Sequence, residues 1–384
     1  MTDDRPDGVA VYVHWPYCAR ICPYCDFNVV RDRGWREEQA VLIQAIVTDL
    51  EAQGVRIGRR PLVSLFFGGG TPSLMRPADV AAVVDAARRL FPTQGPVEIT
   101  LEANPTDAEA AHFAALAEAG VNRLSLGAQS LDDRELTLLG RNHSAQEARR
   151  AITVAAGVFD RLSIDLIYAL PGQTVAAWRV ALNQAVSLGF EHVSPYQLTI
   201  EPTTAFGRAV ARGALVPPDD DAAADLYEAT QATLEAAGFQ AYEVSNHARS
   251  GDARSTHNLH VWRGGDYVGV GPGAHGRLTQ DGMRVASVAR HRIADYVAGV
   301  ASGEPWIERQ ALHGREAAEE RLLLGLRTTE GVPLVLLESL ELDPGSARVT
   351  SLVDGGFVAV ADGRLAATAR GRPVLDAVLK TLLT

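Results

Sequence analysis

The chain has little cysteine: its 384 residues include only three, at positions 18, 22 and 25. An odd number of cysteines gathered in so short a stretch is a poor disulfide framework and a good metal site. Long apolar runs are also absent, so we expect no membrane span. The first residues, MTDDRPDG, are acidic and polar, unlike a secretory signal or a transit peptide. These absences together predict a cytoplasmic protein.

An excess of positive charge is missing as well. The chain carries 36 Lys and Arg against 47 Asp and Glu, a formal net charge of −11. Such a surface repels phosphate backbones, and no local basic run offsets it, so we expect no nucleic-acid partner. The hydrophobic share of 47% is ordinary for a globular protein. The length allows two domains, or one large domain with an appendage.

A strand-then-helix alternation runs from residue 8 to about 200. This spacing predicts parallel strands joined by crossover helices, in an open sheet or a barrel. The strands are predicted at Val9–Trp15, Leu62–Phe67, Val97–Ala103, Arg123–Ala128, Leu162–Ala169 and His192–Ile200. The helices between them are predicted at Glu37–Gln53, Ala78–Leu90, Asp107–Ala119, Ala145–Ala156 and Val175–Leu188.

Residues with useful chemistry follow these strands at their C-terminal ends, where α/β proteins place functional groups. The cysteines follow the first strand, and Gly68-Gly69-Gly70-Thr71-Pro72 follows the second. Glu102 ends the third strand, Gln129 closes the fourth, and Asp165 lies in the fifth. We therefore expect one functional site at this end of the sheet.

After about residue 210 the alternation stops. The sequence predicts a helix over 222–237, a glycine-rich region over 264–276, and helices followed by a hairpin from 314 onward. That order resembles a winged helix, although eight Lys and Arg against ten Asp and Glu speak against a DNA-reading role. We predict a barrel over 1–210, a connecting segment over 211–300 and a small C-terminal domain over 301–384.

The three cysteines have the spacing Cys18-x3-Cys22-x2-Cys25. Thiolates hold iron–sulfur clusters, usually four to a cluster, so three on one loop leave one iron open to another ligand. A zinc site with His14 as the fourth ligand is the alternative, but structural zinc commonly takes its ligands as two separated pairs. The spacing favours a cluster with one open iron.

The segment from Tyr12 to Cys25, YVHWPYCARICPYC, resembles the signature loop of the radical S-adenosylmethionine (SAM) superfamily. Its Tyr-x-His-x-Pro-x-Cys lead and the following Asp26-Phe27 are similar to the oxygen-independent coproporphyrinogen III oxidase family, and within it to the HemW branch of haem chaperones. The resemblance covers nearly the whole chain. It implies a partial (β/α)6 radical SAM barrel, a [4Fe-4S] cluster on the three cysteines, and SAM bound at the open iron.

The same resemblance implies roles for residues at the strand ends. Gly69, Gly70 and Thr71 match the segment that holds the methionyl end of SAM, and Glu102 matches the position that contacts its amino or ribose groups. Without the resemblance, Arg141 also fits a surface salt bridge, Gln129 a strand-end cap and Asp165 a buried hydrogen-bonding anchor. The further positions that match the family's SAM pocket are Tyr12, Tyr24, Gln129, Arg141 and Asp165.

Two features separate the chaperone branch from the oxidases. Phe27 stands where the oxidases carry a further cysteine, and the oxidases have a longer segment before the cluster loop. The segment His257-Asn258-Leu259-His260-Val261-Trp262 resembles the branch's His-Asn-x-x-Tyr-Trp motif, with Val261 in place of the tyrosine. The resemblance implies His257 as a haem ligand. A structural loop, with its histidine hydrogen-bonded and its tryptophan in the core, is the alternative.

We therefore predict a radical SAM haem chaperone that binds haem and transfers it to an unidentified acceptor protein. An electron donor such as a flavodoxin or ferredoxin is expected as a further partner. One alternative is an oxygen-independent coproporphyrinogen III oxidase or a related radical SAM enzyme, including a methyl transferase. Another is a zinc-stabilised α/β binding protein without redox chemistry. Whether the chain is an enzyme stays open.

Overall fold

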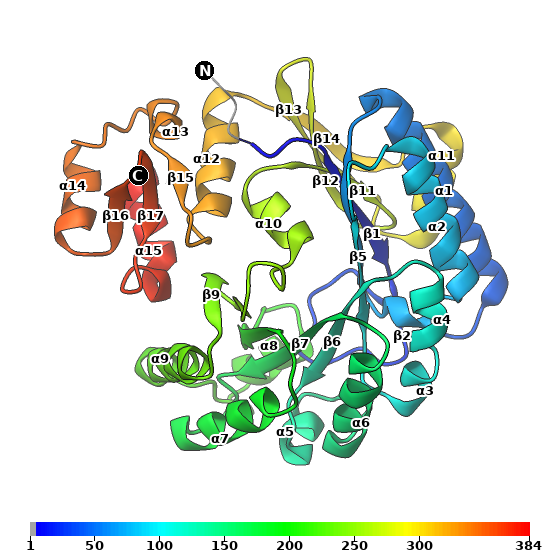
Figure 1. Cartoon of the computed structure of the whole chain (residues 1–384), viewed down its shortest axis with the longest axis horizontal. Helices are drawn as coiled ribbons and strands as arrows, with labels where there is room; N and C mark the ends of the chain where they lie inside the picture. Colours follow the sequence, from blue (N-terminus) through cyan, green and yellow to red (C-terminus); the bar gives the residue numbers. More distant parts are fainter. Residues whose placement is uncertain (1–4) are drawn as a thin grey trace.

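Six parallel strands form the centre of the molecule (Figure 1). The computed structural model describes residues 5–384, so the first four residues of the predicted barrel segment lie outside the described part. The central strands stand side by side in chain order: β1 (Val9–Trp15), β4 (Leu62–Gly69), β5 (Glu98–Ala103), β6 (Arg123–Gln129), β7 (Arg161–Tyr168) and β8 (His192–Gln197). These bounds confirm the predicted strands to within a few residues.

Helices cover the outer side of this sheet (Figure 1). Their apolar residues recur on one face and pack against the strands, as Leu42, Ile46 and Leu50 of the first helix do. The predicted continuous helix over 107–119 is wrong, because the chain turns at His112. The helices between the central strands are α1 (Arg36–Ile57), α2 (Pro77–Leu90), α3 (Asp107–Ala110), α4 (Phe113–Glu118), α5 (Asp133–Leu138), α6 (Ala145–Ala156) and α7 (Val175–Val186).

The sheet continues beyond the predicted strands at both edges. Within residues 5–384 it has 12 strands and stays open between β14 and β9, which confirms a partial rather than a closed barrel. β11 pairs in parallel with β1, and the other added strands pair antiparallel. The added strands are β9 (Gln240–Glu243), β10 (Asn246–Ala248), β11 (Asp266–Val270), β12 (His275–Gln280), β13 (Met283–Ala289) and β14 (Trp306–Leu312). The helices of this region are α8 (Ala205–Ala211), α9 (Asp220–Ala236) and α11 (Ile293–Ser302).

The helix α10 (Thr256–Trp262) lies on the inner side of the curved sheet (Figure 1). Its first turn is held by Glu98, whose carboxylate accepts the backbone N–H groups of Thr256 at 2.9 Å and His257 at 2.8 Å. These donors have no partner within the helix, so a carboxylate there stabilises its N-terminus. Because Glu98 begins β5, α10 lies at the end of the barrel where the strands start.

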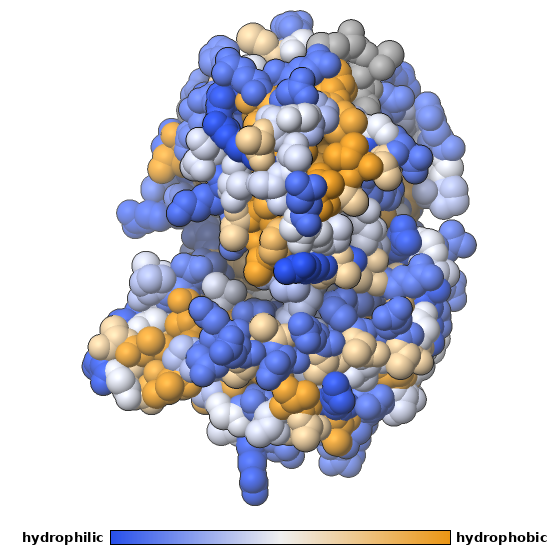
Figure 2. All heavy atoms as spheres, turned by 90° about the vertical axis from the view of Figure 1, so that its left-hand side faces the viewer, coloured by the Kyte–Doolittle hydropathy of each residue, from blue (hydrophilic) through white to orange (hydrophobic). Residues whose placement is uncertain are grey.

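The C-terminal part has a hydrophobic core of its own. Its helices are followed by a hairpin in a three-stranded sheet, as the sequence predicted. Figure 2 looks onto this side of the molecule and shows apolar residues gathered over it; exposed examples are Val353, Val360 and Val374. The elements are α12 (Gly314–Gly325), β15 (Val332–Pro333), α13 (Val335–Glu338), α14 (Ala347–Asp354), β16 (Val358–Ala361), β17 (Arg364–Ala367) and α15 (Leu375–Leu383).

Ion pairs join this C-terminal part to the barrel. Arg327 donates to the fully buried Glu243 of β9 at 2.6 Å, and its guanidinium lies 4.8 Å from the centre of the Trp262 ring on α10. Arg263, just after α10, donates to both carboxylate oxygens of Glu330. The positions of the boundaries at 210 and 300 stay a prediction. In the described part of the chain, no helix is both long and apolar enough to cross a membrane.

Candidate functional site

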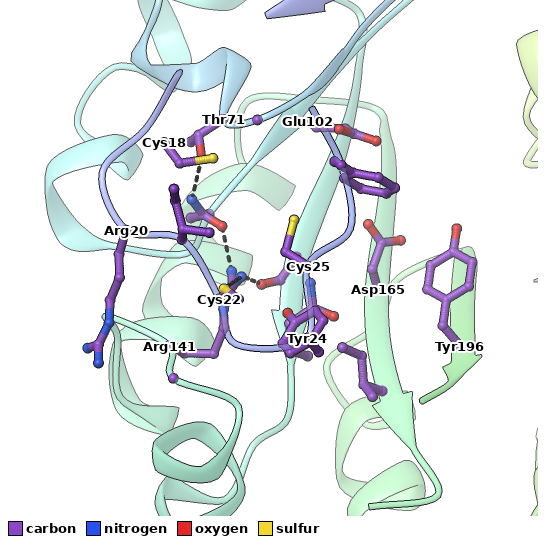
Figure 3. A pocket seen from close by; sticks show the side chains of 18 of the residues that line it. Cys18, Arg20, Cys22, Tyr24, Cys25, Thr71, Glu102, Arg141, Asp165 and Tyr196 are labelled. Atoms are coloured by element: carbon purple, nitrogen blue, oxygen red, sulfur yellow. Dashed lines mark hydrogen bonds between the residues drawn. The ribbon is translucent and has the colours of Figure 1, made fainter. Parts of the chain in front are cut away.

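A pocket of about 410 Å³ lies at the C-terminal ends of the central strands (Figure 3). It is bounded by the cysteine loop after β1, the glycine turn after β4 and the ends of the strands from β5 to β8. The structure therefore brings most of the predicted residues together. Those that line the pocket are Cys18, Cys22, Tyr24, Cys25, Gly69, Gly70, Thr71, Glu102, Gln129, Arg141 and Asp165.

The three thiols enter this pocket from one loop. Cys18 belongs to the short strand β2 (Tyr17–Cys18), and the Cys22 sulfur accepts a hydrogen bond from Arg141 at 3.3 Å. Burial raises the pKa of Cys18 to about 11 and raises the pKa of Cys25 above its ordinary value. The free thiols of Cys18 and Cys25 therefore keep their protons at neutral pH, and a bound metal would displace those protons and stabilise the thiolates.

His14 is already engaged on both sides of its ring. Its Nε2 lies 2.9 Å from the carbonyl oxygen of Asn28, and its Nδ1 lies 3.1 Å from the hydroxyl of Tyr12. The chain contains no fourth cysteine. The zinc alternative thus loses the ligand that would close its shell, whereas a cluster with an open iron needs no such ligand.

The Gly-Gly-Gly-Thr-Pro turn packs directly on the cysteine loop. The N–H of Gly70 donates to the carbonyl of Trp15 at 2.7 Å, and the N–H of Thr71 donates to the carbonyl of Tyr17 at 2.8 Å. A Cβ on Gly70 would stand 2.6 Å from that Tyr17 oxygen, so only glycine fits. The glycines thus let two segments of the site meet. Their contact with SAM stays a prediction.

Two carboxyl groups project into the opposite side of the pocket (Figure 3). Burial, and then the neighbouring Asp165, raises the pKa of Glu102 to about 8, while the N–H of Gly69 donates to it at 3.2 Å. Burial also raises the pKa of Asp165, against a hydrogen bond that the Ser125 hydroxyl donates at 3.0 Å. Among the described residues Glu102 has no Lys or Arg partner. It keeps unused capacity for N–H or O–H groups of a ligand.

Arg141 holds the cysteine loop against the strands (Figure 3). Its guanidinium donates to the Cys22 sulfur, to the side-chain oxygen of Asn104 and to the carbonyl of Gly127. Asn104 in turn donates to the hydroxyl of Thr71 at 3.1 Å. Arg141 therefore lies inside the site, and a surface salt bridge is the wrong reading of it.

Backbone geometry is unusual at the rim of the pocket. Gln129, which ends β6, has a φ of 64°, and Ala169, directly after β7, has a φ of 59°. Left-handed backbone is uncommon in residues other than glycine, and such residues gather at binding sites. The pairing of β6 with β7 also shifts register before Gln129. This bulge turns the end of the strand toward the pocket.

Sequence reasoning missed several polar residues of the pocket, among them Asn104 and Ser125. Asn104 directly follows β5, so the rule that picked Glu102 would also have found it. Ser125 lies within β6, and its direction depends on how the sheet curves, for which the sequence holds no signal. Tyr196, near the end of β8, also lines the pocket.

Tyr12 and His257 do not line this pocket, and both lie inside the barrel. The ring of Tyr12 lies 6.2 Å from that of Phe66, measured between centres. His257 is only 6% exposed on α10, and its Nδ1 lies 2.9 Å from the hydroxyl of Ser64. Ser64 is near the start of β4 and Gly69 ends it, about 16 Å further along the strand. The haem motif forms a helix in place of the expected loop, and its buried, hydrogen-bonded histidine fits the structural alternative as well as the haem one.

An open barrel with a three-cysteine loop at its strand ends is the arrangement expected of a cluster-binding α/β protein. The model of the radical SAM superfamily matches residues 12–185, and that of the HemN C-terminal domain matches residues 312–374. In structure, 99% of the chain superposes on 91% of coproporphyrinogen III oxidase (HemN) from Escherichia coli with a TM-score of 0.81. That pair shares 20% identity, which shows the fold alone.

Relatives match over nearly the whole chain. Radical S-adenosyl methionine domain-containing protein 1, mitochondrial, from Bos taurus is 41% identical, over 98% of this chain and 87% of its own. The protein named heme chaperone HemW from Mycobacterium tuberculosis is 37% identical, over 99% of this chain and 95% of its own length. The chain therefore belongs to the radical SAM superfamily, and within it to the family of these two relatives.

Membership of this superfamily implies a [4Fe-4S] cluster and SAM, and the residues present fit both groups. Three thiols with no fourth cysteine suit a cubane with one open iron. No three metal-binding side chains in residues 5–384 surround one point, but a cubane binds each thiolate at a different iron. The adjoining pocket has the volume usual for small ligands and offers carboxyl, amide and guanidinium groups.

Proposed function

We propose that this chain is a haem chaperone that binds one [4Fe-4S] cluster, SAM and haem, and passes haem to an acceptor protein. The observation that carries the proposal is its match, over nearly its whole length, with a protein named heme chaperone HemW. A second protein of that name, from Escherichia coli, is 40% identical over 74% of this chain. We also propose a cytoplasmic location, which the bacterial origin of these relatives supports.

In this proposal the pocket residues divide into three groups. Cys18, Cys22 and Cys25 ligate three irons of the cluster, and SAM occupies the pocket beside the fourth. Cluster and SAM together supply one-electron chemistry when bound. Glu102 and Asp165 bind donor groups of SAM, and Arg141 keeps the loop in place. The remaining predicted SAM contacts are Tyr12, Tyr24, Gly69, Gly70, Thr71 and Gln129; Tyr12 does not line the pocket, so we propose an indirect contact for it.

We propose His257 as a haem ligand, with one condition set by its burial. Nδ1 is engaged by Ser64, and the ring packs 4.9 Å from that of Phe66. Haem therefore reaches Nε2 only when α10 moves away from the inner side of the sheet. Burial also lowers the pKa of His257 to about 4, so the imidazole is neutral and ready to bind iron at physiological pH.

Stoichiometry on anaerobically reconstituted protein tests the proposal. We expect about four irons and four sulfides per chain, with one haem bound after titration and removal of the excess. Cys18→Ser should abolish the cluster, whereas transfer of haem to an added apo-acceptor distinguishes a chaperone from a storage protein. A colourless protein with a single zinc would refute the cluster assignment.

The haem site is tested by titrating His257→Ala and the wild type with haem. We expect a shifted Soret band and roughly tenfold weaker binding in the variant, because one axial ligand is lost. Ser64→Ala is the matched control, since it breaks the same hydrogen bond while keeping the imidazole. Equal loss in both variants would mean that His257 supports the fold of α10 and does not bind iron.

The oxidase remains the second candidate, because Glu102, Gln129, Arg141 and Asp165 share one pocket with the cysteines. Incubation with coproporphyrinogen III, SAM and a reductant under anaerobic conditions distinguishes the two. Formation of protoporphyrinogen would establish the oxidase in place of the chaperone.

A further inference from the structure

The cysteines of the chain suffice for one iron–sulfur cluster and leave none for a second that could pass it electrons. Its three cysteines all belong to one loop, so a second iron–sulfur cluster held by cysteines has no ligands. An electron for the proposed cluster must therefore come from another molecule that approaches the cysteine loop. The inference that follows rests on the proposed function, because it assumes that the three cysteines hold a redox-active cluster.

A short strand that ends in an arginine lies directly beside the first cysteine. β3 (Val30–Arg31) pairs in parallel with β2, and this register places Arg31 opposite Cys18. The N–H of Asp32 donates to the carbonyl of Cys18 at 2.8 Å, so the pairing continues past the strand. Any protein that binds this strand therefore comes close to a cluster ligand.

Arginines on this side are exposed and have no acidic partner among the described residues. Arg20, Arg31 and Arg33 are exposed, and Figure 3 shows Arg20 extending away from the cysteines. The nearby Asp32 instead accepts the N–H of Gly34 at 2.7 Å and an N–H of Gln39 at 3.0 Å. Three exposed arginines thus lie on this side of a chain whose net charge is −11, and the exposed acidic residues nearest to them in sequence are Asp26 and Glu37.

Apolar groups accompany these charges. Arg20 and Arg31 line a shallow surface cavity of about 520 Å³ together with Ile21, which is 46% exposed. Trp35 is 54% exposed, and the guanidinium of Arg33 lies 5.3 Å from its ring centre. Exposed aromatic and arginine side chains are the residues that most often dominate binding at protein interfaces.

We propose that these residues, Arg20, Ile21, Arg31, Arg33 and Trp35, form a docking surface for an acidic one-electron carrier protein. Charge complementarity and contact with the cysteine loop favour this occupant. A second copy of the acidic chain would satisfy the charge, but it would bring no electron to the cluster. In the reaction the carrier loses one electron and the cluster gains it, and no covalent bond forms or breaks.

Charge reversal on the docking surface tests this with reduced flavodoxin as the probe. The double variant Arg31→Glu with Arg33→Glu is compared with Arg88→Glu with Arg179→Glu, which makes the same charge change at exposed sites on the outer helices α2 and α7. We expect the second-order rate of cluster reduction to fall roughly tenfold in the first variant only, at low salt. The difference should disappear at high ionic strength.

Two further measurements distinguish weaker docking of the carrier from a change in the cluster itself. Flavodoxin affinity, measured on immobilised protein with and without the cluster, should fall in the same variant, and reduction by dithionite should be unchanged. Equal rates and affinities in both double variants would refute the docking surface. Self-association in the wild type that Arg31→Glu with Arg33→Glu abolishes would also refute it, in favour of a second copy. A protein that takes up no cluster would instead refute the proposed function.

Discussion

The carboxyl group of Glu102 predicts how the stability of the ligand-free protein depends on pH. Its pKa is about 8 in the folded chain against an ordinary value of 4.5. A carboxyl with a raised folded pKa favours the folded state fully below its unfolded pKa, and this contribution is lost as the pH rises toward the folded pKa. Stability should therefore fall between pH 5 and pH 8, because ionisation favours the unfolded chain.

The magnitude follows from about 1.4 kcal/mol per unit of pKa. Between pH 5 and pH 8 the full difference in pKa would cost about 3.5 kcal/mol. Because the carboxyl lines a pocket that water enters, we expect about 2 kcal/mol. Glu102→Gln removes the titrating proton and nearly keeps the shape. The variant should therefore gain about 2 kcal/mol relative to the wild type from pH 5 to pH 8.

Urea unfolding of both proteins without ligands, at several pH values, measures this gain. Asp165 titrates in both proteins and interacts with Glu102, so comparison with the wild type reports Glu102 together with that interaction. The same variant should bind SAM roughly tenfold to a hundredfold more weakly, because a hydrogen bond to a charged group is lost. If the free energies of unfolding of the two proteins changed in parallel from pH 5 to pH 8, the ionised Glu102 would cost the fold nothing. That result would refute the reasoning.

Two other substitutions have expected outcomes. Arg141→Met removes the donor to the Cys22 sulfur, so a chelator should remove the reconstituted cluster roughly tenfold faster. The loss is measured by the decrease of the cluster's visible absorbance. An unchanged rate would exclude a supporting role for Arg141. Arg327→Ala leaves the buried Glu243 without its cation, so urea unfolding should show a loss of about 3 kcal/mol, and adding Glu243→Gln should restore part of it.

The centre of the fold could be predicted because its signals are local. Apolar strands with the spacing of crossover helices identified β1 and β4 through β8, and residues that follow such strands meet at one edge. Glu102 and Asp165 were placed in the same pocket for this reason together with the family resemblance, and Arg141 by the resemblance alone. The cysteine spacing needed no fold at all, since one loop carries it.

The edges of the sheet and the place of α10 could not be predicted. The added strands β9, β10 and β11 have only three to five residues each, too few for a clear alternation. Glu98 resembled any residue at the start of a strand, yet its carboxylate holds a helix 158 residues away, at Thr256. Such contacts depend on how the curved sheet brings distant segments together. Sequence periodicity carries no information about them.

The two ends of the barrel give the proposed cofactors separate places. The cysteines and their pocket occupy the end where the strands finish, and His257 lies near the end where they start. Between them the rings of Phe66 and Tyr12 fill the interior, and the Tyr12 hydroxyl lies 3.1 Å from Nδ1 of His14 below the cysteine loop. In the proposed function, haem at α10 and SAM at the cluster would therefore occupy opposite ends of the barrel. Any influence of one on the other has to pass through this packed interior or through movement of α10.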